Sequence, residues 1–326
     1  MNTYKRLTTQ LFILTLGLIL LGCDTGSKPE QIWVPETEGI LSAAVSNTGK
    51  YVLLGIDSGK ANVWDISKKK QSLLHSWQHQ EGEAGGIKLV DLSYNDNFAL
   101  TAEENSLAWW DVKAGKILGF WRLEGIKSIA ISKDGQSAVV GLRNQAQYFS
   151  LKSSQPVFQL KHPDFIKTVA LSDDGRYAIT GSDNAEAKLW SLKNGKLLHT
   201  WKYRNKLFSV ALSADGEYAM ANAVYGETNV WNTKSGKLIK KIPPNRVTIS
   251  AAEFNSSGKK LVTARVTQRI DLWIPQTGKL LNSWRPKKNN NWRPSSANIL
   301  EIKFTNKDKS IISVTSNGIV QRWNSK

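Results

Sequence analysis

A repeat of about 40 residues constrains the fold of this chain more than any other feature. Seven segments of alternating hydrophobicity each end on an aromatic marker: Trp64, Trp110, Phe149, Trp190, Trp231, Trp273 and Trp323. Consecutive markers lie 39 to 50 residues apart. Because self-similarity at such a period is the signature of a repeat architecture, we expect one array of similar units rather than unrelated domains.

A second marker keeps step with the first. Four units carry a turn of the form Ser-x-x-Gly, and the other three carry degenerate copies of it. In the fourth unit, residues 169–181 predict a strand, a turn and a strand, Lys188–Trp190 a third strand and Lys196–Trp201 a fourth. Four strands per unit and seven units predict an all-β, seven-bladed β-propeller over residues 31–326.

The two ends of the chain predict how the ring closes. The last unit stops three residues after Trp323, before any fourth strand, whereas residues 31–34 have the pattern of an isolated strand. In units two, four and six a Trp lies eleven residues past the marker, and Trp33 would fill that place in unit seven. We therefore expect an N-terminal strand to complete the last blade and to remove an open sheet edge.

The units resemble degenerate WD repeats, and the resemblance covers residues 31–326. In that family a His, a Ser or Thr, an Asp and the marker Trp form a buried hydrogen-bonded tetrad. His162, Thr180 and Trp190 match this pattern in the fourth unit, but Asn184 stands at the Asp position. The resemblance therefore implies a propeller that has no complete tetrad.

The first 22 residues are interpreted as a signal peptide. Lys5 and Arg6 precede an apolar run, residues 7–21, that is too short to cross roughly 30 Å of hydrocarbon. The run closes on Leu-Leu-Gly-Cys23, which resembles the bacterial lipobox. This resemblance implies cleavage before Cys23 and a diacylglycerol on its thiol; the alternative is an uncleaved signal anchor with an incidental Cys.

Asp24 follows the lipidated Cys23, and residues 23–30 have the polar, Gly- and Pro-containing composition of a linker. In lipoproteins of enteric-type Gram-negative bacteria, an Asp at this position implies retention in the inner membrane. The expected location is therefore the periplasmic side of the cell membrane, with the inner membrane favoured over the outer.

The basic residues fall on two faces of the expected ring. Turns between strands one and two and between strands three and four share a bottom face; the other turns and the links between blades share a top face. The candidate membrane-facing residues of the bottom turns are Lys68, Lys69, Lys70, Lys193 and Lys234. The candidate partner-binding residues of the top face, which are types enriched at interfaces, are Arg143, Arg204, Tyr225, Arg265, Arg269, Trp292 and Arg293. The alternative for both sets is a solvated loop rim.

Signatures of catalysis or metal binding are weak. His75 and His79 lie on one predicted strand, about 13 Å apart, which is too far to share a metal. One Cys cannot supply a disulfide or a Cys-based metal site, and no catalytic motif is present. We therefore expect no enzyme, no metal and no cofactor. An enzyme of this fold would instead bring a partly buried carboxylate or His to one mouth of the channel.

These features together predict a monomeric, lipid-anchored interaction platform that holds protein partners of a cell-envelope complex through its loops. A net charge of +17 favours a first alternative, a binder of an anionic envelope polymer or lipid headgroup. A propeller enzyme with a loop-built site is the second alternative. Export argues against a nucleic-acid partner, which would otherwise explain the charge.

Overall fold

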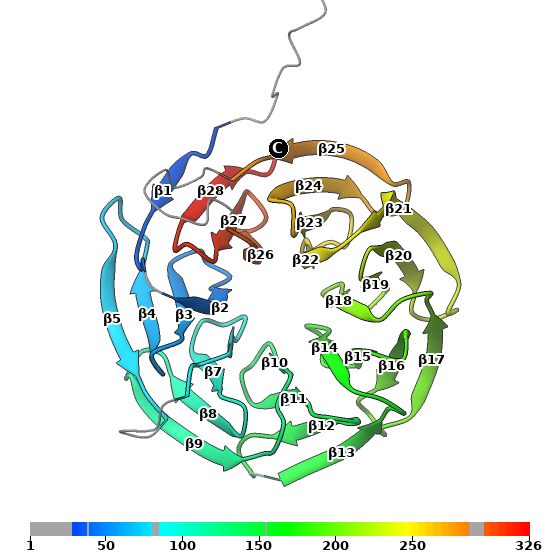
Figure 1. Cartoon of the computed structure of the whole chain (residues 1–326), viewed down its shortest axis with the longest axis horizontal. Helices are drawn as coiled ribbons and strands as arrows, with labels where there is room; N and C mark the ends of the chain where they lie inside the picture. Colours follow the sequence, from blue (N-terminus) through cyan, green and yellow to red (C-terminus); the bar gives the residue numbers. More distant parts are fainter. Residues whose placement is uncertain (1–27, 38, 80–84, 154, 287–296) are drawn as a thin grey trace, which may run out of the picture.

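The computed structural model describes residues 28–37, 39–79, 85–153, 155–286 and 297–326. Within these ranges the chain forms seven four-stranded antiparallel sheets arranged as the blades of a ring (Figure 1). The predicted seven-bladed β-propeller is therefore confirmed. In the same ranges, no helical segment has the length and apolarity needed to cross a bilayer.

The blades follow the order of the chain, except that the first strand joins the last blade. Blade 1 comprises β2 (Ile40–Val45), β3 (Tyr51–Ile56), β4 (Ala61–Asp65) and β5 (Ser72–Trp77). Blade 2 comprises β6 (Leu89–Leu92), β7 (Phe98–Ala102), β8 (Ser106–Asp111) and β9 (Lys116–Arg122). Blade 3 comprises β10 (Ser128–Ile131), β11 (Ser137–Gly141), β12 (Gln145–Ser150) and β13 (Gln155–Lys161). Blade 4 comprises β14 (Ile166–Leu171), β15 (Tyr177–Ser182), β16 (Glu186–Ser191) and β17 (Leu197–Lys202). Blade 5 comprises β18 (Leu207–Leu212), β19 (Tyr218–Ala223), β20 (Gly226–Asn232) and β21 (Leu238–Val247). Blade 6 comprises β22 (Ile249–Phe254), β23 (Leu261–Arg265), β24 (Arg269–Ile274) and β25 (Lys279–Trp284). Blade 7 comprises β26 (Ile299–Thr305), β27 (Ser310–Thr315), β28 (Val320–Asn324) and β1 (Gln31–Trp33).

The Ser-x-x-Gly marker is a turn that caps itself. In blade 4, the Oγ atom of Ser172 accepts the N–H of Tyr177 at 3.0 Å, and Gly175 has a φ of +70°. A positive φ is costly for side-chain-bearing residues, which explains the Gly. In two degenerate copies, Asp96 and Asp308 take positive φ angles and bind the turns of the neighbouring blades 1 and 6.

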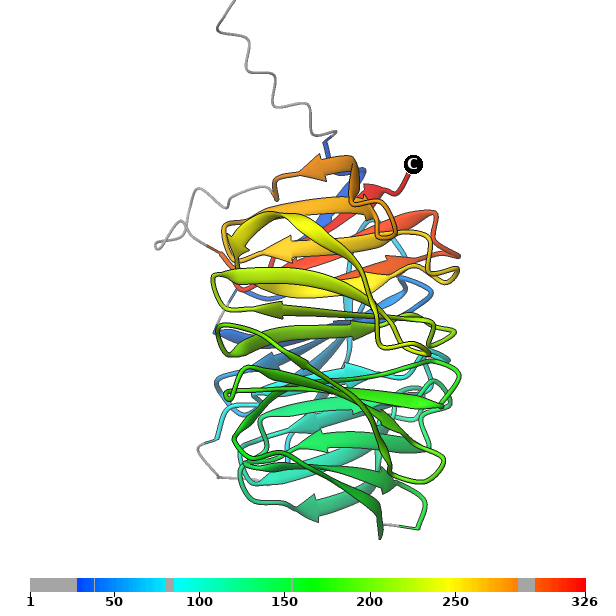
Figure 2. The same cartoon turned by 90° about the vertical axis from the view of Figure 1, so that its right-hand side faces the viewer.

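The core lies between the blades, because each sheet packs its face against the next one around the ring (Figure 2). Trp109 of blade 2 illustrates this arrangement. Its side chain, 7% exposed, packs in one cluster with Ile131 and Val140 of blade 3. Trp109 therefore contributes to packing between blades 2 and 3.

The N-terminal strand closes the ring as predicted, although it is one residue shorter than residues 31–34. Gln31 pairs with Arg322, and Trp33 pairs with Val320, so that β1 is the fourth strand of blade 7. Trp33 is 1% exposed, and its Nε1 atom donates to the carbonyl oxygen of Lys68 at 2.8 Å. Closure thus joins the first and last blades through both backbone and side-chain contacts.

The fourth blade contains three members of the expected buried network. The hydroxyl of Thr180 lies 2.6 Å from Nε2 of His162 and accepts the indole N–H of Trp190 at 2.8 Å. Asn184 contacts Ser182 and not His162, whose Nδ1 atom has no hydrogen-bond partner among the described residues. The implied absence of a complete tetrad in this blade is therefore confirmed.

Blade 2 holds a second network of His, Thr and Trp, which was not predicted from the sequence. Nε2 of His79 lies 2.7 Å from the hydroxyl of Thr101, which accepts the indole N–H of Trp110. On the other side, Nδ1 of His79 lies 2.6 Å from the hydroxyl of Ser106, which donates to Glu103. Glu103 thus supplies a carboxylate on the Nδ1 side of His79, as the Asp does in WD repeats, but Ser106 lies between the carboxylate and the imidazole.

Candidate functional site

The polarity of the strands defines the two faces of the ring. In each blade the first strand runs from top to bottom, and Figure 2 shows the ring edge-on, with turns along both sides. As a fourth strand, β1 runs from bottom to top, so that Gln31 marks its bottom end. The chain therefore enters the ring from the bottom face, beside the turn that contains Lys68.

All five candidate membrane-facing lysines are exposed on the bottom face. Lys68, Lys69 and Lys70 occupy the turn between β4 and β5, next to β1. Lys193 lies in the turn between β16 and β17, and Lys234 in the turn between β20 and β21. The structure thus places a basic turn beside the entry of the N-terminal segment, and two more across the ring (Figure 1).

A depression on the top face brings two of the candidate partner-binding residues together. Arg204 and Tyr225 line a hollow of about 640 Å³ between blades 4 and 5, which Asp183 and Lys206 also line. The side chain of Tyr225 is 70% exposed, and its backbone N–H donates to the hydroxyl of Thr248 at 2.9 Å. This bond holds the residue at a φ of +45°, so its ring is presented to solvent on a fixed turn.

Arg265 and Arg269 have a structural partner inside their own blade. Their guanidinium groups lie 2.5 and 2.9 Å from the carboxylate of Asp271, which is fully buried. Because an uncompensated buried charge is costly, these two arginines stabilise blade 6. Only 14% of the Arg265 side chain is exposed, compared with 37% for Arg269.

The remaining candidates are separate from this hollow. Arg143 is exposed in the turn between β11 and β12 of blade 3. Trp292 and Arg293 lie outside the described residues, as do the lipidation and sorting candidates Cys23 and Asp24. The structure therefore groups Arg204 with Tyr225 and leaves Arg143 on a different part of the top face.

The channel contains charged residues that the sequence analysis did not single out. At one position of the inner strands, four blades carry alanine: Ala44, Ala130, Ala170 and Ala211. The equivalent residues of blades 2, 6 and 7 are Asp91, Glu253 and Lys303. An alignment of the seven repeats on their marker residues would show these three charges against an alanine background.

Two buried histidines are held in the neutral form. Burial lowers the pKa of His79 and of His162 to about 4, so both imidazoles are neutral in the folded ring. Nε2 of His199 donates to the carbonyl oxygen of Thr233, 2.8 Å away, between neighbouring blades. Among the described residues, no group of three His, Cys, Asp or Glu side chains is arranged to hold a metal ion.

Comparison with known proteins adds to this geometry. Residues 154–191 match the WD40 family, whose description is "WD domain, G-beta repeat". The chain is also similar to U3 small nucleolar RNA-associated protein 12 of Saccharomyces cerevisiae, with 26% identity over 113 residues. That segment is 34% of this chain but only 12% of the yeast protein. The WD40 match and the ring of seven blades together support a WD-repeat propeller.

Proposed function

We propose that the protein is a lipid-anchored interaction platform on the periplasmic side of a membrane, where it holds protein partners through its top face. A WD-repeat propeller is consistent with a protein-interaction scaffold. The observation that carries the rest is the division of the ring into two faces. The N-terminal strand enters from the face with the lysine turns, and the hollow of Arg204 and Tyr225 opens on the other.

A lipid anchor on Cys23 would place the bottom and top faces of the ring at different distances from the bilayer. Seven residues separate Cys23 from Gln31 and span at most about 25 Å. Lipidation at Cys23 would therefore keep the bottom face close to the bilayer. Anionic headgroups attract nearby basic side chains by roughly 1 kcal/mol each, and this attraction decays within a Debye length. The top face would then point away from the membrane, toward a partner.

The enzyme alternative receives some support from the channel, which does contain partly buried carboxylates. Two of them have a structural use. Asp91 accepts the backbone N–H of Ile131 in the next blade at 2.8 Å, and Glu253 accepts that of Phe304 in the next blade. Because these bonds hold neighbouring inner strands together, we propose a platform without catalysis.

The yeast relative is named for an association with a small nucleolar RNA. The similarity covers too little of that protein to suggest an RNA partner for this chain. An anionic envelope polymer or lipid headgroup stays the second candidate, because the exposed bottom lysines would bind either. Such binding would weaken steeply with salt, whereas a protein complex with a packed interface would not.

Lipidation is tested in cells with a Cys23→Ser variant. The proposal predicts that labelled palmitate is incorporated into the parent chain and not into the variant, which should accumulate as an unprocessed precursor. Labelling of the variant would contradict lipidation at this residue.

The two faces are tested with variants of equal charge. A chain of residues 28–326, which contains the whole ring, is bound to vesicles rich in phosphatidylglycerol. Lys193→Glu with Lys234→Glu should weaken binding more than Lys60→Glu with Lys161→Glu, which makes the same change of charge on exposed top-face residues. Equal losses would mean that the charge acts without regard to face.

A further inference from the structure

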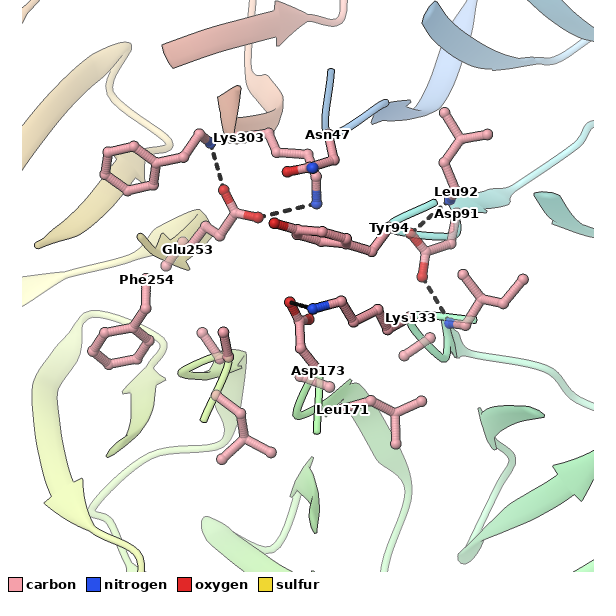
Figure 3. A pocket seen from close by; sticks show the side chains of 18 of the residues that line it. Asn47, Asp91, Leu92, Tyr94, Lys133, Leu171, Asp173, Glu253, Phe254 and Lys303 are labelled. Atoms are coloured by element: carbon pink, nitrogen blue, oxygen red, sulfur yellow. Dashed lines mark hydrogen bonds and ion pairs between the residues drawn. The ribbon is translucent and has the colours of Figure 1, made fainter. Parts of the chain in front are cut away.

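The channel opens on the bottom side into a cavity of about 300 Å³ (Figure 3). Near its mouth, Lys133 lies between the ring of Tyr94 and the carboxylate of Asp173, with its Nζ atom 4.3 Å from the ring centre and 3.9 Å from the oxygen. Deeper inside, Nζ of Lys303 lies 3.0 Å from Glu253. The side chains of Lys303 and Glu253 keep 19% and 26% of their surface open to the channel.

Most carboxylates of this cavity already have hydrogen-bond donors. Asp91 accepts two backbone N–H groups, Glu253 accepts Lys303 and a backbone N–H, and Asp308 accepts Ser256. Glu301 differs from them. It lines the cavity from β26 and also lines the upper half of the channel, but the described part of the chain donates no hydrogen bond to its carboxylate.

The cavity holds more acidic than basic groups. Its lining includes the five carboxyl groups of Asp91, Asp173, Glu253, Glu301 and Asp308, and the two ammonium groups of Lys133 and Lys303. Burial raises the pKa of Glu301 to about 8, and the nearby Glu253 and Asp91 add to this effect, whereas Lys303 opposes it. Burial also raises the pKa of Asp91, of Glu253 and of Asp173. In a chain with a net charge of +17, this cavity thus gathers more carboxyl than ammonium groups, and a bound cation would favour the ionised form of Glu301.

We infer that the cavity binds a small organic cation that carries primary ammonium groups, with Glu301 as the inner anchor and Asp173 near the mouth. The alanine side chains at 130, 170 and 211 offer an apolar wall for a methylene chain. The ring of Tyr94 already holds the ammonium group of Lys133 over one face, so this aromatic side chain accepts a cation near the mouth. Calcium, in contrast, requires six to eight oxygen ligands, and two of the carboxylates here, Asp91 and Glu253, already accept backbone N–H groups.

Calorimetric titration of the full chain with 1,4-diaminobutane tests this inference. Glu301→Gln should weaken binding about tenfold or more, because the amide keeps the shape of the side chain but cannot ionise to pair with an ammonium group. The matched control is Glu104→Gln, which removes an exposed top-face carboxylate paired with Lys88 and should leave the affinity unchanged. Asp173→Asn provides a second variant at the mouth, should Glu301→Gln fail to fold.

The pH dependence gives an independent readout. An ammonium ligand favours the ionised form of Glu301, so binding should release a proton below its pKa of about 8 and should tighten as the pH rises through that value. Glu301→Gln should lose this dependence. The inference would be overturned by an absence of binding to the parent chain, by equal affinity of the parent and the Glu301→Gln and Asp173→Asn variants, or by stoichiometric binding of calcium that displaces the diamine.

Discussion

Replacement of Trp33 by alanine should open the ring at its closure. The indole is 1% exposed, and it packs in the core cluster with Leu54 and Ile312, which belong to blades 1 and 7. It also donates to the carbonyl of Lys68 and lies 4.9 Å from the guanidinium of Arg322. Removal of a buried Trp costs about 3–5 kcal/mol, and loss of the hydrogen bond adds about 1 kcal/mol. The sum is a large part of the roughly 5–15 kcal/mol that stabilises a typical domain.

Chemical denaturation followed by circular dichroism measures this loss, and hydrogen exchange locates it. The control is Trp284→Ala, because Trp284 is equally buried and packs between blades 6 and 7 without being part of the closing strand. Both variants should lose several kcal/mol. Only Trp33→Ala should expose the edge of β28, with fast amide exchange there and concentration-dependent association under native conditions. A loss below about 1 kcal/mol, or equal exchange of β28 in both variants, would refute the proposed role of Trp33.

Two further predictions concern buried ionisable side chains. The free energy of unfolding should fall as the pH decreases from about 6.5 to about 4, by up to about 3 kcal/mol per histidine, because the unfolded chain protonates His79 and His162 while the folded ring keeps them neutral. Denaturation across this range should show a flatter profile for the variant with Gln at both positions, and an unchanged profile would contradict the neutral state. Arg265→Ala should cost about 3 kcal/mol, because buried Asp271 then keeps Arg269 as its one remaining cation beside the hydroxyl of Ser283, whereas Arg204→Ala in the open hollow should cost less than about 0.5 kcal/mol. Equal costs in denaturant titrations would show that the ion pair does not stabilise the blade.

The fold was predictable because it is repeated. Each unit shows the same alternation and the same turn, so local ambiguities average out, and the missing fourth strand of the last unit accounts for the orphan strand at Trp33. The second histidine network was harder to find. His162 stands four residues before its strand β14, but His79 stands ten residues before β6, so it falls out of the repeat pattern.

The candidate sites were less predictable than the fold. Spacing assigned Arg204 and Arg265 to the same face, but only the folded chain shows that Arg265 turns toward buried Asp271 while Arg204 faces the hollow. The channel charges were missed for a similar reason. Glu301 and Lys303 look like ordinary polar positions of an alternating strand, and it is the closure of seven blades that makes them face one cavity.

The division of the ring into a membrane face and a partner face is tested most directly by photo-crosslinking in intact cells. A crosslinking residue is placed either at Tyr225 on the top face or at Lys193 on the bottom face, both of which are exposed. We expect protein adducts from position 225 and lipid adducts from position 193. Lipid adducts from position 225, or the same protein adducts from both positions, would contradict the proposed orientation.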